Sequence, residues 1–396
     1  MPFVVFVLAV AVFAQGTSEF MVSGLLASIA ADAGVSLGAA GLLTSLFAVG
    51  MVLGAPVLAA GASRLPVRNS VTVFLGLFCA AHLVGAVATD FTVLLVTRVV
   101  AAVANAGFLA VALAMLPRLV GPALVGRATS VVVSGVTVAC IAGVPAGTLL
   151  GQFWGWRSAF WAVAALGAAM LVPVWILVGR AVLDATPVDR QGIPIRVEWS
   201  VLRLPSVRTA VAAGVLVNAA TFAAFTYLGT ITAGVSGGDR RWVPIALALF
   251  GIGSFAGVTL TGRYSDRHRE RILAAGTVVL VGVWLAAALL ADTLAGVLIM
   301  AVLAGAVAFG IGSTLIATIV QTAATSAPRI AGALATTAFN LGAVLGPAAA
   351  GLMVDRTDHP SAALWCGAVC TAAAVGVVLT GRRAPVSGEP LHVDAR

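Results

Sequence analysis

Lysine is missing from this sequence of 396 residues, and charged residues of any kind are scarce. All 22 basic residues are arginine, 14 residues are acidic, and charged residues make up 9% of the chain against 61% hydrophobic residues. A chain with so few polar groups cannot cover the surface of a water-soluble globule of this length. The composition therefore excludes a soluble protein and predicts one that is embedded in a lipid bilayer.

Cysteine is also rare, and the four residues present, Cys79, Cys140, Cys366 and Cys370, all fall inside apolar runs. This pattern excludes a disulfide scaffold and a cysteine-rich zinc site. The apolar runs contain no His-Glu-x-x-His zinc motif, no paired aspartates and no Ser–His couple placed to suit an intramembrane hydrolase. We therefore expect no metal, no other cofactor and no enzymatic activity.

Twelve apolar runs are long enough to cross the hydrocarbon core of a bilayer, which takes about 20 residues in a helix. Because the runs are apolar on every face, they lack the alternation that the strands of a membrane barrel would show. The sequence therefore predicts an all-α membrane protein with twelve transmembrane helices. The expected spans are 3–29, 38–62, 70–88, 92–116, 128–153, 159–179, 208–233, 243–262, 272–291, 294–320, 332–354 and 362–381.

Arginine is distributed unevenly between the alternate connections of these spans. One set of connections holds 17 arginines and the other set holds 4. Since basic residues near span ends stay on the cytoplasmic side, both termini are predicted to face the cytoplasm. The net charge of +8 is thus explained by membrane topology, and we expect no nucleic-acid partner.

The longest polar connection, 180–207, divides six spans from six. We expect an N-terminal half at 1–179, this cytoplasmic linker, a C-terminal half at 208–381 and a cytoplasmic tail at 382–396. Related motifs recur about one half apart, because Pro145 in the fifth span and Pro347 in the eleventh are separated by 202 residues. Two parallel six-helix halves are an organisation typical of secondary transporters.

Two charged residues lie at membrane depth, where each costs roughly 2.5 to 3.5 kcal/mol to insert. Glu19 is the only carboxylate within any span, and Arg98 in the fourth span lies at a comparable height, the two being about 4 and 9 Å outward of their span midpoints. Since arginine keeps its charge, we expect the two to pair, with Asp90 as a rival partner about two turns away. The hypothesis is that Glu19 exchanges protons and Arg98 responds, and the alternative is a fixed ion pair between two helices.

Polar and aromatic residues recur at helical spacing around this pair. A mostly apolar cavity with a few amides suits an uncharged or amphipathic, partly aromatic substrate. The alternative is that the amides bond to neighbouring helices and the phenylalanines only fill space. Besides Glu19 and Arg98, the candidate substrate-binding residues are Gln15, Asn105, Phe108, Asn218, Phe222, Phe225, Phe339 and Asn340. His82 in the third span is predicted to be a hydrogen-bonded structural histidine.

Two groups of residues suit a role in conformational change. The short loop expected after the eighth span places an acid among arginines, which can latch the cytoplasmic face shut. The fifth span combines proline with glycines, which predicts a kinked and closely packed helix. These residues are Gly262, Asp266, Arg267 and Arg271 in the loop, and Gly143, Pro145, Gly147 and Gly151 in the span.

The glycines of the eighth span superficially fit a dinucleotide-binding motif, but they lie in mid-membrane. No strand precedes them, as such a motif requires. Gly253 and Gly257 therefore predict close packing against another helix.

Taken together, these motifs resemble the major facilitator superfamily, and within it the twelve-span drug:proton antiporters. The loop at 262–271, the buried Arg98 and the glycine-proline motif of the fifth span resemble three signatures of that family. The segments that look most like chloramphenicol-resistance exporters of high-GC bacteria are 16–20, 24–26, 105–108, 155–157 and 221–225. One departure is Ser63, which stands where the family has an aspartate in the first-half loop, so no acid-mediated latch is expected there.

The resemblance implies that Glu19 is the proton-titrating acid, that Arg98 is its functional partner, and that spans 1, 4, 5, 7, 8, 10 and 11 wall the cavity. It also implies a monomer. We expect a multi-pass protein of the bacterial inner membrane that exports a small neutral or amphipathic antibiotic, with a phenicol favoured, in exchange for protons by alternating access. Its partners would be that substrate, protons and the lipid bilayer. The alternatives are export of a sugar, nucleoside or other metabolite, and a passive channel or facilitator.

Overall fold

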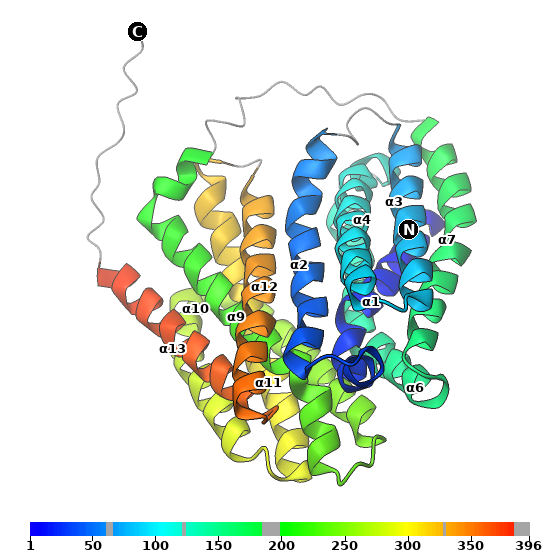
Figure 1. The fold of residues 1–396 in the computed structure, drawn as a ribbon. Helices are drawn as coiled ribbons and strands as arrows, with labels where there is room; N and C mark the ends of the chain where they lie inside the picture. The colour runs from blue at the N-terminus through cyan, green and yellow to red at the C-terminus, as the bar shows by residue number, and fades with distance from the viewer. Residues whose placement is uncertain (61–65, 121–123, 184–198, 328–329, 384–396) are drawn as a thin grey trace.

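The structure is a computed structural model that describes residues 1–60, 66–120, 124–183, 199–327 and 330–383. The side chains within these ranges are described except those of 55–60, 180–183, 199, 265–268 and 381–383. Throughout these ranges the regular structure is helical, without a strand, as the sequence predicts. The α-helices are α1 (Phe3–Ala33), α2 (Leu37–Ala60), α3 (Val67–Val87), α4 (Phe91–Leu119), α5 (Val125–Val138), α6 (Val144–Trp154), α7 (Arg157–Leu183), α9 (Pro205–Val235), α10 (Trp242–Leu289), α11 (Leu294–Ala324), α12 (Ala331–Thr357) and α13 (Ala362–Arg383) (Figure 1).

These helices provide 12 candidate membrane spans in the described residues, which confirms the predicted number. α5 and α6 together form one span, Val125–Trp154, whereas α10 contains two, Trp242–Tyr264 and Arg269–Leu289. Large apolar side chains remain exposed on the outside, including Phe153 at 73% and Leu289 at 70%. Such surfaces suit contact with lipid tails and would be unfavourable in water.

The connection between the eighth and ninth spans differs from the prediction. The sequence analysis expects a short loop there, but the backbone is helical throughout Trp242–Leu289. Residues 263–275 contain neither glycine nor proline, so nothing in the local sequence ends the helix. Gly262 and Arg271 are exposed, while the side chains of Asp266 and Arg267 lie outside the described part, and the latch stays a prediction.

The fifth span is irregular where the sequence predicts a kink. A five-residue π-helix, η3 (Ala139–Gly143), separates α5 from α6. Pro145 follows two residues after its end, and because the proline ring removes a backbone donor, the hydrogen-bond ladder widens at this point. A side chain at Gly143 would press on Phe13 and Thr17 of α1, so the glycine allows the two helices to approach closely.

Close packing through glycine is confirmed in the eighth span as well. A Cβ atom at Gly253 would lie 2.9 Å from the carbonyl carbon of Val302, and one at Gly257 would lie 2.6 Å from that of Ala306. α10 and α11 therefore touch through their backbones, which only glycine permits at these two positions.

Helices α2 and α12 lie side by side (Figure 1) and are joined by hydrogen bonds near one end. Asp355 of α12 accepts hydrogen bonds from the Ser36 hydroxyl at 2.7 Å and from the Gly38 N–H at 2.9 Å. Its carboxylate thus caps the N-terminus of α2 from the other half of the chain. Ser45 of α2 donates to the Val344 carbonyl at 2.8 Å. We call these contacts the α2–α12 seal.

Gln152 at the end of α6 reinforces the same face, because its amide donates to the Arg240 carbonyl at 2.6 Å. Residue 240 belongs to the connection between α9 and α10. Spans cross the membrane in alternate directions, so this connection lies on the same side as the start of α2 and the end of α12. The helices before residue 184 and the helices after residue 198 are therefore held together at one membrane face.

Replacing the capping carboxylate should loosen the seal. We expect Asp355→Asn to increase the population with this face open by about five-fold, because the amide keeps one of the two acceptor oxygens and each lost hydrogen bond costs roughly 1 kcal/mol. Asp358→Asn removes the same charge one turn away and should leave the population unchanged. Spin labels on the α1–α2 and α12–α13 connections would report both states by their distance distributions. Identical distributions in the two variants would contradict the prediction.

Candidate functional site

A central cavity of about 390 Å³ is lined by residues of α1, α5, α9, α10, α11 and α12. Most of its wall is apolar, which excludes a strongly charged cargo from tight binding there. The aromatic residues of the wall are Phe20, Phe222, Phe309 and Phe339, and its polar residues are Glu19, Thr137, Asn218, Thr221, Ser313 and Asn340.

The α2–α12 seal closes the central cavity at one end. In α12 the cavity residues Phe339 and Asn340 come before Val344 and Asp355, which form the seal. In α9 the cavity residues 217–222 come before Tyr227, whose hydroxyl donates to the Pro347 carbonyl at 3.4 Å. The cavity therefore lies on the side of the seal where α9 begins.

Glu19 is half-buried and lines the central cavity beside Phe20. The ion pairs found among the described residues join Asp32 to Arg157 and Asp239 to Arg241, so neither involves Glu19. The direct ion pair that the sequence analysis expects between Glu19 and Arg98 is thus not formed in this conformation. The carboxylate instead faces the space that a substrate would occupy.

Arg98 of α4 is only 1% exposed and binds the residue that precedes Glu19. Its Nη1 donates to the Ser18 hydroxyl at 2.9 Å, and its Nη2 donates to the Ser18 carbonyl at 3.0 Å. A longer hydrogen bond of 3.5 Å runs from Nε to the Leu43 carbonyl, and the guanidinium lies over the Phe47 ring at 4.3 Å. These contacts satisfy a buried cation in the way that membrane proteins require.

His82 of α3 is connected to the same serine. Its Nε2 lies 2.6 Å from the Ser18 hydroxyl and its Nδ1 lies 2.8 Å from the Phe78 carbonyl. The structural role predicted for His82 is therefore supported, since both ring nitrogens have partners. The sequence did not predict the link from His82 to Arg98 through Ser18, because the three residues come from three different helices.

Asp90, the rival partner of Arg98, has a different place. It is the N-cap of α4 and accepts hydrogen bonds from the backbone N–H groups of Thr92 at 2.7 Å and Val93 at 3.2 Å. The N–H groups of Val93 and Thr92 hold the pKa of the Asp90 carboxyl below its usual range. Asp90 is thus an exposed, ionised helix cap, and Arg98 is satisfied without it.

The other candidate residues divide into three sets, of which one is Phe225 alone, on the wall of a second pocket. Asn218, Phe222, Phe339 and Asn340 line the central cavity together with Glu19, whereas Gln15, Asn105 and Phe108 are buried away from its wall, to which α4 contributes no residue. The amides partly serve packing, since Asn218 donates to the Phe339 carbonyl at 2.6 Å and Asn340 to the Thr336 carbonyl at 3.0 Å. Both keep an amide oxygen as a possible acceptor for a ligand.

Neither amide atom of Gln15 has a hydrogen-bond partner in the described part of the chain, although the residue is 1% exposed. A buried and unsatisfied amide costs free energy. Gln15 lies one helical turn from Glu19 in α1.

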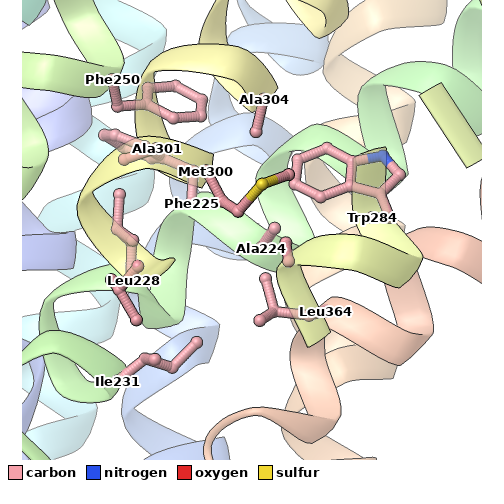
Figure 2. A pocket seen from close by; sticks show the side chains of 12 residues that line it. Ala224, Phe225, Leu228, Ile231, Phe250, Trp284, Met300, Ala301, Ala304 and Leu364 are labelled. Atoms are coloured by element: carbon pink, nitrogen blue, oxygen red, sulfur yellow. The ribbon is translucent and has the colours of Figure 1, made fainter. Parts of the chain in front are cut away.

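Phenylalanine rings connect the central cavity to a second, much smaller pocket of about 30 Å³ in the part formed by α9, α10, α11 and α13. Phe20 contacts Phe225 at 5.9 Å between ring centroids, Phe225 contacts Phe250 at 4.9 Å, and Phe250 contacts Phe309 at 5.9 Å. Figure 2 shows Phe225 and Phe250 on the wall of this second pocket with Leu228, Met300, Trp284 and Leu364. Its lining offers no carboxylate or amide side chain, which makes the central cavity the candidate functional site.

The sequence profile of the Major Facilitator Superfamily matches residues 8–338. The chain belongs to the Major Facilitator Superfamily. It is 48% identical over 393 residues to a chloramphenicol resistance protein of Streptomyces lividans, covering 98% of this chain and 99% of that protein. It is also 30% identical over 348 residues, or 88% of each chain, to the inner membrane transport protein YdhP of Escherichia coli strain K12.

Solved structures support the same fold. A bacterial homologue of the human lysosomal transporter Spinster, in an inward-facing and occupied conformation, superposes with a TM-score of 0.73 at 18% identity. The match covers 96% of this chain and 94% of the other. The chain is therefore a transporter and not an enzyme, with a small-molecule substrate and a multi-pass location in the bacterial inner membrane.

The guanidinium group of Arg98 should not be replaceable by another cationic side chain. Lysine at this position keeps the charge but cannot reach the Ser18 hydroxyl, the Ser18 carbonyl and the Leu43 carbonyl together. We expect Arg98→Lys to lower the free energy of unfolding by about 2 kcal/mol, whereas Arg127→Lys at an exposed position should have no effect. Thermal unfolding of both variants in detergent measures the difference, and equal melting temperatures would refute the expectation.

Proposed function

We propose that this transporter exports a small neutral or amphipathic antibiotic, most specifically chloramphenicol or a related phenicol, in exchange for protons. The observation that carries the proposal is the position of Glu19. Its carboxylate lies on the wall of an apolar and aromatic cavity, and the nearest buried cation, Arg98, is bound to another residue. An acid in this position can be reached by both a cargo and a proton.

The chemistry of the wall supports an uncharged aromatic cargo. Phe20, Phe222 and Phe339 offer ring faces, while the amide oxygens of Asn218 and Asn340 can accept hydrogen bonds. Chloramphenicol combines an aromatic ring with hydroxyl groups and an amide, which matches these groups in kind. The similarity to the Streptomyces lividans chloramphenicol resistance protein points to the same substrate class.

The direction of transport follows from the orientation that the arginine distribution predicts. If both termini and residues 180–207 face the cytoplasm, α9 begins on the cytoplasmic side and the α2–α12 seal closes the outer side. The central cavity then loads cargo from the cytoplasm. Rocking of the N-terminal half, 1–179, against the C-terminal half, 208–381, would open the seal and close the inner side.

In the proposed scheme, Glu19 alternates between a protonated and a deprotonated state. Facing outward, Glu19 binds a proton as the drug leaves, and facing inward it releases the proton as the next drug enters. Exchange of a neutral drug for protons moves net charge inward, so the membrane potential assists by about 2.3 kcal/mol per charge per 100 mV. One chain contains all the residues of this scheme, so we propose a monomer as the transporting unit.

Substitution of the acid should uncouple transport. In proteoliposomes with a trapped pH indicator, we expect chloramphenicol to drive proton movement through the native protein and not through Glu19→Gln, because the amide cannot exchange a proton. Asp292→Asn removes an exposed carboxylate and should transport like the native protein. Equal drug-driven proton fluxes with native protein and Glu19→Gln would remove Glu19 from the mechanism.

Resistance profiling tests the cargo separately. In a host that lacks its own pumps, expression should raise the inhibitory concentration of chloramphenicol several-fold, and Asn218→Leu should remove most of that gain because it deletes a cavity acceptor. Aminoglycosides, which carry several positive charges, should show no change, because the cavity is mostly apolar. A host with unchanged tolerance to every phenicol would favour export of a sugar, nucleoside or other metabolite instead.

A further inference from the structure

Three buried polar residues form a cluster behind the wall of the central cavity, and two of them have no part in the proposed exchange. Ser18 of α1 is 0% exposed, and His82 of α3 and Arg98 of α4 are each 1% exposed. None of the three is among the residues that line the cavity. Each contact among them is therefore made away from substrate.

The donors and acceptors of this cluster have one consistent arrangement. The Phe78 carbonyl can only accept, so His82 carries its hydrogen on Nδ1 and donates it over 2.8 Å. In a neutral ring Nε2 then accepts, and the Ser18 hydroxyl donates to it over 2.6 Å. The serine oxygen is left to accept from Nη1 of Arg98 at 2.9 Å. One directed chain thus runs from Arg98 through Ser18 and His82 to the Phe78 carbonyl.

This arrangement has room for one positive charge only. A protonated His82 would point a second N–H at the Ser18 oxygen, beside the guanidinium, and the serine hydrogen would lose its acceptor. His82 therefore serves as a neutral acceptor. Because His82 accepts the hydrogen of the Ser18 hydroxyl, a lone pair of the serine oxygen points toward Arg98. The Ser18 carbonyl accepts the second hydrogen bond of the guanidinium, at 3.0 Å.

Glu19 follows Ser18 directly in α1, and consecutive residues of a helix point about 100° apart. While Ser18 faces Arg98, Glu19 faces the central cavity, and the two charged groups are not joined as an ion pair. We propose that Ser18 and His82 form a dock that holds Arg98 apart from Glu19, so that the acid is free to exchange protons. Ser18 and His82 are then positioning residues for proton coupling, an inference that rests on the proposed function.

Two substitutions at His82 separate this role from simple packing. His82→Gln keeps an acceptor that can reach the Ser18 hydroxyl, whereas His82→Leu fills similar space without one. In proteoliposomes we expect His82→Leu to slow proton-driven uphill transport of chloramphenicol about five-fold, with the drug concentration at half-maximal rate unchanged. Exchange of chloramphenicol for chloramphenicol, which needs no net proton transfer, should continue at the native rate. His82→Gln should match the native protein in both assays.

Two results would overturn the dock. One is native proton-driven transport by His82→Leu, and the other is an equal loss of both transport modes in a folded variant. If His82→Leu does not fold, Ser18→Ala removes the central hydroxyl with the loss of a single atom and should give the same selective loss. Native activity of Ser18→Ala would be equally decisive against the proposal.

A measurement without substrate keeps the dock testable if the proposed function fails. Native protein that moves no protons with chloramphenicol would refute the function and leave the dock standing. In a double-mutant cycle, the losses in unfolding free energy from His82→Leu and Arg98→Gln should be non-additive, because both break one chain of hydrogen bonds. Additive losses would show that His82 and Arg98 act independently and would refute the dock alone.

Discussion

A guanidinium that keeps its charge inside a membrane must have all of its hydration replaced by protein groups, and Arg98 sets this constraint for the N-terminal part of the molecule. Its partners come from three other helices: Ser18 from α1, Leu43 and Phe47 from α2, and His82 from α3 through the serine. The cation is therefore one of the contacts that set the rotation of α1 about its own axis. Because Ser18 is turned toward Arg98, the next residue, Glu19, is turned toward the central cavity.

The contacts that close one end of the cavity are of another kind. The α2–α12 seal consists of a few neutral or charge-assisted hydrogen bonds and of close backbone approach near Gly38 and Gly351. Each such hydrogen bond contributes only about 1 kcal/mol net. A transporter that alternates between two conformations needs contacts of this strength, because a seal as strong as a helix core would hold it in one state. In the proposed mechanism, the contacts around Arg98 stay in place while those of the seal open and close.

Aromatic contacts join α1 to helices of the second half of the chain. Phe20, adjacent to Glu19, touches Phe222 and Phe225 of α9, and the cluster continues through Phe250 of α10 to Phe309 of α11. Rings can slide and tilt against one another without leaving a polar group unsatisfied. The cluster gives α1 an apolar contact with helices of the second half beside the cavity, next to the residue that is proposed to exchange protons.

Much of this fold can be predicted from the sequence, because a long apolar run that crosses a bilayer satisfies its backbone hydrogen bonds by forming a helix. The twelve spans, the close packing at Gly253 and Gly257, the irregularity before Pro145 and the presence of two charged residues within spans all followed from residue types and their spacing. The helical backbone across 263–275 did not, since a charged segment between two spans is compatible with a loop or a helix.

The partners of these charged groups were decided only by the tertiary structure. The sequence predicts similar heights in the membrane for Glu19 and Arg98, yet Arg98 binds Ser18. Asp90 caps its own helix, and Asp355 caps a helix more than 300 residues away in the chain. Sequence spacing gives the height of a residue and the face of its helix, but not the rotation of that helix against its neighbours. That rotation is the sum of many packing contacts, and it determined that the acid faces the cavity while the cation does not.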